Sequence, residues 1–110
     1  MEITRGAIVV MAARGAYTNK PRPAVVVQAN AFNPTHLSIT VCPITSEYQD
    51  ASIFRVALPP GGRTGLSGAS QVMIDKVVSI PRAAIARQIG SCDPVSVDAI
   101  DHALRVWLAL

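Results

Sequence analysis

Polar side chains able to bind a phosphate gather at the ends of the apolar runs in this sequence of 110 residues. An arginine guanidinium can bind two phosphate oxygens at once, and a neighbouring hydroxyl can add a further hydrogen bond. RNA cleavage requires little more, because the 2′-OH is a nucleophile already tethered beside the phosphorus atom. These residues therefore permit RNA cleavage, although Arg22 alone would more often be a surface ion-pair residue. The set comprises Arg14, Tyr17, Asn19, Lys20, Arg22, Thr45, Ser46, Gln71, Asp75 and Lys76.

The familiar catalytic motifs are missing from the sequence. It contains no GxSxG turn, no P-loop, no HExxH and no glycine-rich dinucleotide loop. His36 stands at the end of a predicted loop and His102 on the polar face of a predicted helix, so the two give no sign of a two-histidine ribonuclease site. Cys42 and Cys92 form no CxxC pair, so we expect no structural zinc and no cofactor.

Composition and charge limit the class of protein. Half of the residues are hydrophobic and 15% are charged, which is too apolar for a disordered tail. The excess of apolar residues indicates either a partner surface, with homodimerisation the first choice, or a well-filled core. The net charge of +3 permits binding to a polyanion. No signal peptide or run of about 20 apolar residues is present, so we expect a soluble, cytoplasmic protein.

Short apolar runs separated by glycine and proline predict five or more strands. They lie at residues 6–12, 22–28, 37–42, 52–58, 70–80 and 86–90, with a loop at 13–21 and a helical turn at 82–85. We expect Pro43 to end the third strand, and residues 70–80 to form one long strand or two joined by a bend. This pattern is typical of a mainly β protein built as one domain over residues 1–110, a small, strongly bent antiparallel barrel.

The last segment of the sequence predicts a single helix. Asp93 can cap its first turn, and Pro94 suits the first helical position. Apolar residues then recur at helical spacing, while charged and polar residues fall on the opposite side. Asp98 and Asp101 lie near the positive end of the helix dipole. The apolar face comprises Val97, Ile100, Leu104, Trp107 and Leu108, and we expect it to pack against the sheet or across a dimer.

Three blocks and the terminal helix resemble the MazF/PemK toxin family. Residues 6–10 (GAIVV), a loop and residues 22–28 (RPAVVVQ) resemble the opening strand, variable loop and R-P-A-V-V of that family. Residues 41–46 (VCPITS) resemble its V-x-P-I-T-S/T strand end. Residues 70–80 (SQVMIDKVVSI) resemble its later strand, in which an acidic residue precedes a hydrophobic run ending in S/T-I. The resemblance covers nearly the whole chain and keeps the order of the family.

The resemblance implies a dimeric SH3-like barrel of the CcdB/PemK type and a function. The implied function is the toxin of a type II toxin–antitoxin system, inhibited by an acidic, partly disordered antitoxin segment. Its activity would be sequence-specific, metal-independent cleavage of single-stranded RNA, leaving a 2′,3′-cyclic phosphate and a 5′-OH. The catalytic arginine of the family falls on Arg22 and its partner hydroxyl on Thr45. Asp75 falls where some members place an active-site carboxylate.

One departure from the family leaves the general base open. Many members carry a glutamate in the loop before R-P, whereas residues 14–21 here contain no acid. The proton of the 2′-OH could therefore pass to Asp75, to a phosphate oxygen or to water. RNA contacts are expected from Arg14, Tyr17, Asn19, Lys20, Ser46, Gln71 and Lys76. Two other functions stay open, a CcdB-like inhibitor of DNA gyrase and a degenerate, non-toxic binding module.

Overall fold

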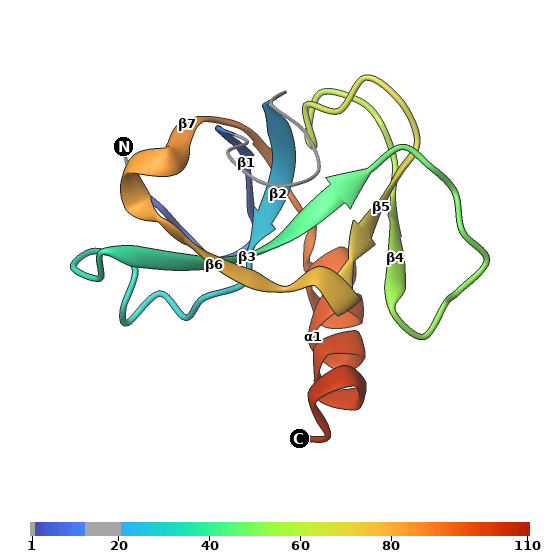
Figure 1. Ribbon diagram of the computed structural model, residues 1–110. Helices are drawn as coiled ribbons and strands as arrows, with labels where there is room; N and C mark the ends of the chain where they lie inside the picture. The colour runs from blue at the N-terminus through green and yellow to red at the C-terminus, as the bar shows by residue number, and fades with distance from the viewer. Residues whose placement is uncertain (1, 13–20) are drawn as a thin grey trace.

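The computed structural model describes residues 2–12 and 21–110. The described residues form seven strands, two short 3-10 turns and one helix (Figure 1). The strands are β1 (Ala7–Met11), β2 (Arg22–Val26), β3 (Ser38–Thr45), β4 (Arg55–Leu58), β5 (Ser70–Met73), β6 (Val78–Pro81) and β7 (Ile85–Ser91). The turns are η1 (Ile74–Lys76) and η2 (Arg82–Ala84), and the helix is α1 (Pro94–Leu108). This is the mainly β class with a C-terminal helix that the sequence predicts.

All strand pairs in the described sheet are antiparallel, in the order β4-β5-β3-β2-β1-β7. The long strand β3 has two partners on one side, because residues 38–41 pair with β6 and residues 44–45 pair with β5. Between these two pairings the chain turns through η1, so residues 70–80 are two strands joined by a bend. The SH3-like barrel implied by the resemblance stays a prediction, since this path runs from one free edge to another.

The core falls into two clusters on the two faces of β1, β2 and β3. One cluster includes Ile8, Val25 and Ile44 and packs against Ile100 of α1. The other includes Val9, Val26 and Ile39 and lies on the opposite face of the same strands. Figure 1 shows α1 running beside β4, and α1 also contacts η1, on the side of the first cluster.

Two predicted strand bounds are wrong. β3 continues through Pro43 to Thr45, because Pro43 pairs with Ala24 on one side and stands on the other between the pairings with β6 and β5. A missing N–H is tolerated where a ladder is interrupted in this way. β4 begins at Arg55 rather than at residue 52, because the N–H groups of Phe54 and Arg55 both donate to the carbonyl of Ala51 and close a turn.

The predicted helix boundary is confirmed. The Asp93 carboxylate accepts a hydrogen bond of 2.7 Å from the N–H of Ser96, and Pro94 follows it. The apolar stripe is buried only in its first half, at Ile100. Trp107 lies near Phe54, with ring centroids 5.7 Å apart, but it stays half exposed with the residues after it. The described helix is too short to cross a membrane.

Loop 59–69 lies directly against the backbone of β7 through two glycines. Gly65 has a φ of +71°, and a Cβ atom on it would lie 2.1 Å from the carbonyl oxygen of Ile89. A Cβ atom on Gly90 would lie 2.3 Å from the carbonyl of Thr64. Neither position has room for a side chain, and the left-handed φ of Gly65 also favours glycine.

Candidate functional site

Strand register places predicted site residues side by side at the end of β3. Thr45 of β3 pairs directly with Gln71 of β5. Directly opposite residues of antiparallel strands share a face, with Cβ atoms about 5 Å apart. On the other side of β3, the pairing with β2 ends at Ala24 and Pro43, and the same register extended by two residues would set Arg22 opposite Thr45. The end of β3 therefore brings Thr45 and Gln71 together, with Arg22 two residues beyond the last β2–β3 pair.

Arg22 has a restricted backbone and a side chain without a partner among the described residues. It stands between Pro21 and Pro23, and a residue before proline is restricted to extended conformations, as β2 requires. Its side chain is half-buried, and no other described residue hydrogen-bonds or pairs with its guanidinium. The five N–H donors of a guanidinium are thus available to a ligand at this position.

The hydroxyl of Thr45 accepts one structural hydrogen bond, and its proton stays available for a second one. Its Oγ1 accepts a hydrogen bond of 3.1 Å from the N–H of Glu47, which fixes the first turn of the following loop. Accepting this bond leaves the hydroxyl proton free to be donated to a phosphate oxygen. Ser46, beside it, is exposed.

Gln71 is 8% exposed and uses both ends of its amide on one backbone unit. Its Oε1 accepts from the N–H of Gln49 at 3.0 Å, and its Nε2 donates to the carbonyl of Gln49 at 3.1 Å. Arg55 adds a bond of 3.0 Å to the side-chain oxygen of Gln49. The amide of Gln71 therefore holds the loop that follows Thr45.

The sequence alone did not predict that the loop after Thr45 belongs to the site. Gln49 and Arg55 are joined to the site by contacts between distant strands, which no local pattern reveals. Tyr48 did leave a signal, because it is an aromatic residue in the polar stretch directly after Thr45.

The structure sets Asp75 apart from this row. Asp75 lies in η1, between the two pairings of β3. Burial raises the pKa of the Cys42 thiol to about 12, while the charge of Arg5 opposes this rise and the charge of Asp75 adds to it. Cys42 lies about 10 Å along β3 from Thr45. It also faces the opposite side of the sheet, because side chains alternate.

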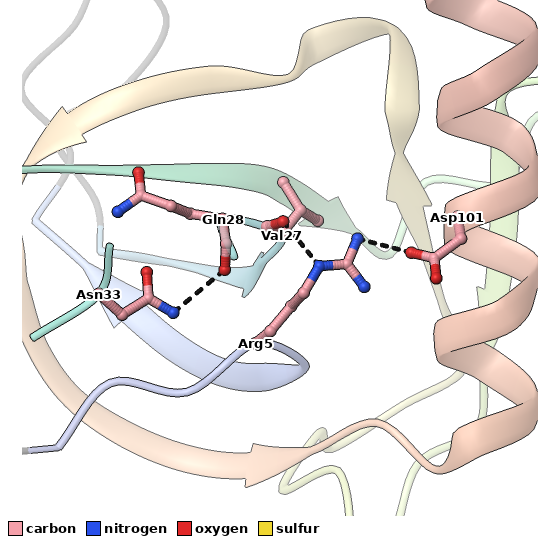
Figure 2. A network of polar contacts seen from close by, with 5 residues as sticks. All are labelled: Arg5, Val27, Gln28, Asn33 and Asp101. Carbon is pink, nitrogen blue, oxygen red and sulfur yellow. Dashed lines mark hydrogen bonds and ion pairs between the residues drawn. The ribbon is translucent and has the colours of Figure 1, made fainter. Parts of the chain in front are cut away.

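A separate polar network joins Arg5 to the residue after β2 and to α1. Figure 2 shows Arg5 between β2 and α1, with its Nε donating to the carbonyl of Val27 at 2.8 Å and its guanidinium paired with Asp101 at 2.5 Å. The Oδ1 atom of Asp75 is buried without a hydrogen-bond partner among the described residues. Lys76 is exposed and makes a contact of its own.

Four predicted RNA-binding residues lie outside the described residues. They are Arg14, Tyr17, Asn19 and Lys20. Within residues 2–12 and 21–110, no three histidine, cysteine, aspartate or glutamate side chains gather as metal ligands would.

The described residues define a small antiparallel β protein with a C-terminal helix. The family model described as "PemK-like, MazF-like toxin of type II toxin-antitoxin system" matches residues 4–108. The chain belongs to this family. A probable endoribonuclease MazF of Mycolicibacterium smegmatis is 42% identical over 106 residues, 96% of each chain. Endoribonuclease MazF9 of Mycobacterium tuberculosis is 33% identical over 103 residues, 89% of this chain and 86% of its own.

Solved structures share the fold at lower identity. MazE-MazF (Form-II) from Deinococcus radiodurans aligns with a TM-score of 0.84 and 23% identity, covering 100% of this chain and 98% of that one. An endoribonuclease in complex with its cognate antitoxin, from a mycobacterial species, aligns with a TM-score of 0.82 and 21% identity, covering 98% and 96%. These matches confirm the fold class, and together with the family they do not favour the gyrase-inhibitor alternative.

Proposed function

We propose that this MazF-family toxin is a sequence-specific endoribonuclease that cleaves single-stranded RNA without a metal ion. The observation that carries the proposal is the β2–β3 register, which, extended by two residues, would set Arg22 opposite Thr45 at the end of β3. A guanidinium with no partner among the described residues and a hydroxyl with a free proton are the two groups that a phosphodiester needs there. Two relatives that match most of the chain are named endoribonucleases, which supports the same activity.

In the proposed reaction the 2′-oxygen of the RNA attacks the adjacent phosphorus atom, and the bond from phosphorus to the 5′-oxygen breaks. The products are a 2′,3′-cyclic phosphate and a 5′-OH. Arg22 binds two oxygens of the phosphate and stabilises the charge that develops on them. An arginine side chain does not act as a proton acceptor in proteins, so the proton of the 2′-OH must go elsewhere. Thr45 donates to a phosphate oxygen and holds the reacting geometry.

The proton of the 2′-OH must reach an acceptor as the attack proceeds, and a proton must reach the 5′-oxygen as it leaves. Asp75, a phosphate oxygen and water are the candidate acceptors. Asp75 is the weakest of these on position, because it lies in η1 rather than in the row of Thr45 and Gln71. The missing acid in residues 14–21 removes another candidate.

The test is incubation of the purified protein with a long RNA in EDTA, followed by mapping of the cut sites and analysis of the ends. We expect cleavage at one short sequence, with cyclic phosphate and 5′-OH ends. Intact RNA under these conditions would contradict the proposal and favour a non-enzymatic binding module.

We propose a homodimer as the working form. The end of α1 carries an exposed apolar surface that includes Val106, Trp107, Leu108 and Leu110, the last 81% exposed. A groove between α1 and β4, lined by Val56, Val95 and Ala99, continues this surface. Contiguous apolar surfaces of this kind mark protein contacts. Sedimentation should show a dimer at micromolar concentration, and a monomer alone would contradict the proposal.

The proposed inhibitor is an acidic, partly disordered segment of a cognate antitoxin that blocks RNA in the cytoplasm. The net charge of +3 and the unengaged Arg22 suit an acidic partner. The complexes of structural relatives with MazE and with a cognate antitoxin support this pairing. Such a segment orders on binding and can cover a large surface. Failure of a co-expressed neighbouring gene product to bind and to restore growth would contradict it.

The residues that line the RNA path are also part of the proposal. Arg14, Tyr17, Asn19 and Lys20 precede β2 and would bind RNA beside Arg22, with Ser46 and Lys76 on the other segments. A tyrosine can stack on an unpaired base and a lysine can bind a phosphate. Lys20→Ala should weaken RNA binding and reduce its dependence on salt, and an unchanged salt slope would argue against a phosphate contact.

A further inference from the structure

The loop after Thr45 is fixed at two points close to the proposed phosphate site. At its start, the N–H of Glu47 donates to Thr45 Oγ1. At its middle, both polar backbone atoms of Gln49 are bound by the buried amide of Gln71, which is the direct partner of Thr45 in the sheet. The loop therefore folds back along the row of site residues rather than extending into solvent.

Tyr48 lies between these two fixed points. Its neighbours on both sides are bound to Thr45 and Gln71, and consecutive Cα atoms are about 3.8 Å apart, so its backbone is held beside the site. Its side chain is nevertheless 79% exposed. A fixed backbone that presents an exposed aromatic ring is preorganised to bind a flat partner, because little conformational freedom of the backbone remains to be lost on binding.

The chemistry of the loop identifies that partner. Residues 46–50 contain no lysine or arginine, and Glu47 and Asp50 flank the tyrosine. These carboxylates repel a phosphate, so the loop does not attract the RNA backbone. An aromatic ring binds the π-face of an unpaired base and is insensitive to the charge of the backbone.

We propose that Tyr48 stacks on one unpaired nucleobase of the RNA next to the cleaved phosphodiester, and that Gln71 is a positioning residue that holds Tyr48 there. The proposal rests on the proposed function, and it adds a base-binding position that the family motifs do not contain. It also gives Gln71 an indirect role in RNA binding, through the backbone of Gln49.

The first experiment measures binding to an RNA oligonucleotide that carries the mapped cut sequence and a 2′-O-methyl group at the cleaved nucleotide. Tyr48→Ala should bind about tenfold more weakly than the wild type, since stacking on one base is worth this much. Tyr48→Phe should restore binding. The slope of affinity against salt should stay unchanged in both variants, because no phosphate contact is lost. Equal affinity of Tyr48→Ala and the wild type, or a reduced slope, would overturn the proposal.

Phe32 supplies the matched control. It is an aromatic residue, 58% exposed, in the loop at the opposite end of β3. Phe32→Ala should bind RNA as the wild type does. The same loss in Phe32→Ala and Tyr48→Ala would show a general effect of removing surface aromatic residues and would overturn the proposal.

A second experiment identifies the base. Each nucleotide of the oligonucleotide is replaced in turn by an abasic one, and binding is measured for both proteins. At one position the abasic change should weaken the wild type but have little effect on Tyr48→Ala, because the two changes remove the same contact. Equal losses in both proteins at every position would contradict stacking by Tyr48.

A third experiment separates positioning by Gln71 from direct contact with RNA. Gln71→Met keeps the length of the side chain and removes both hydrogen bonds. We expect faster amide hydrogen exchange at residues 47–51 in the free protein, together with a loss of affinity that does not add to that of Tyr48→Ala. Gln49→Ala, which keeps the backbone atoms that Gln71 binds, should leave exchange nearly unchanged. Unchanged exchange in Gln71→Met would overturn its positioning role.

Failure of this inference is distinguishable from failure of the proposed function. A wild-type protein that leaves RNA intact would contradict the endoribonuclease proposal. A wild type that cleaves RNA, with Tyr48→Ala cleaving it at the same KM, would contradict only the role of Tyr48. We expect instead that Tyr48→Ala raises KM about tenfold and leaves kcat nearly unchanged, since the ring lies away from the reacting atoms.

Discussion

The two ends of the β2–β3 pair use arginine in opposite ways. At the end near loop 27–37, Arg82 donates to the carbonyls of Asn33 and His36, and Arg5 donates to the carbonyl of Val27 and pairs with Asp101. At the other end, Arg22 has no partner among the described residues. At the first end the guanidinium groups of Arg5 and Arg82 donate to backbone carbonyls. At the second end the donors of Arg22 have no partner among the described residues and can bind a ligand.

This difference separates stability from function on the same two strands. Asn33, at the first end, is 1% exposed, and its side chain binds the carbonyl of Gln28, so loop 27–37 is tied closely to the sheet (Figure 2). Among the described residues, no contact engages the donors of Arg22 or the hydroxyl proton of Thr45. Mutations at one end should therefore change unfolding, and mutations at the other should change cleavage.

The largest expected effect is at Arg22. Arg22→Ala should reduce the cleavage rate by about 10²–10³, because it removes the group that stabilises charge on the phosphate. Arg22→Lys should restore little activity, since a point charge cannot replace a bidentate guanidinium. Thermal unfolding and sedimentation should match the wild type. Near-normal cleavage by a folded, dimeric Arg22→Ala protein would contradict the proposed mechanism.

Thr45 should come next. Thr45→Val keeps the shape of the side chain and removes the hydroxyl, so we expect a rate loss of about 10², near the lower limit for one donor. Thr45→Ser should recover most of the rate. The measurement is the initial cleavage rate of the wild type, Thr45→Val and Thr45→Ser on one oligonucleotide. A Thr45→Ser protein as slow as Thr45→Val would contradict a role for the hydroxyl.

At the first end, Arg82→Met should destabilise the protein by about 1–3 kcal/mol, because the Asn33 carbonyl loses a donor in a buried setting. Cleavage per folded molecule should be unchanged. Urea unfolding gives the loss of stability, and Arg87→Met, at an exposed arginine, is the matched control. If Arg82→Met slowed cleavage without affecting unfolding, the two ends would not be functionally distinct.

The sequence predicted part of the contrast between the two ends of the β2–β3 pair. Polar residues at strand ends permitted phosphate binding, and the resemblance to the MazF/PemK family singled out Arg22 and Thr45, whose roles stay predictions. The cap at Asp93 and the apolar spacing predicted α1, because residue type and local backbone identify the start of a helix. The register that would set Arg22 opposite Thr45 depends on pairing between distant segments.

Long-range contacts explain what the sequence did not predict. Gln71 and Gln49 are 22 residues apart, and their double hydrogen bond exists only once β3 and β5 pair. The prediction that Pro43 ends the strand is wrong, because the interruption that tolerates this proline arises from the change of partner from β6 to β5. Asp75 lies in η1, which forms at the same change of partner.

A smaller effect is expected at Asp75. Asp75→Asn should reduce cleavage by less than about tenfold, whereas loss of a true general base costs at least about 10². The physical reason is that Asp75 lies in η1, outside the row of Thr45 and Gln71. Measuring kcat against pH for both proteins tests this, and a loss of 10² or more with a flattened profile would make Asp75 the base.

The smallest effect concerns acid stability at the start of α1. The N–H of Ser96 donates to Asp93, which lowers the pKa of that carboxyl below its ordinary value of 3.8. The stabilisation is therefore present above that value and is lost as the pH falls through the lowered pKa of the folded state. Asp93→Asn, an uncharged cap, should show a weaker decline of Tm on acidification. Identical declines would contradict this assignment.

The contact between the backbones of loop 59–69 and β7 has a genetic consequence. Cells that express an active toxin grow only when its gene is inactivated, so survivors report every position at which a single change is not tolerated. Most such positions should cluster around Arg22 and Thr45. Gly65 and Gly90, which have no place in the chemistry, should be recovered as often, because even alanine would force two main chains apart. A selection of this kind would identify the close contact between loop 59–69 and β7 without any measurement on the purified protein.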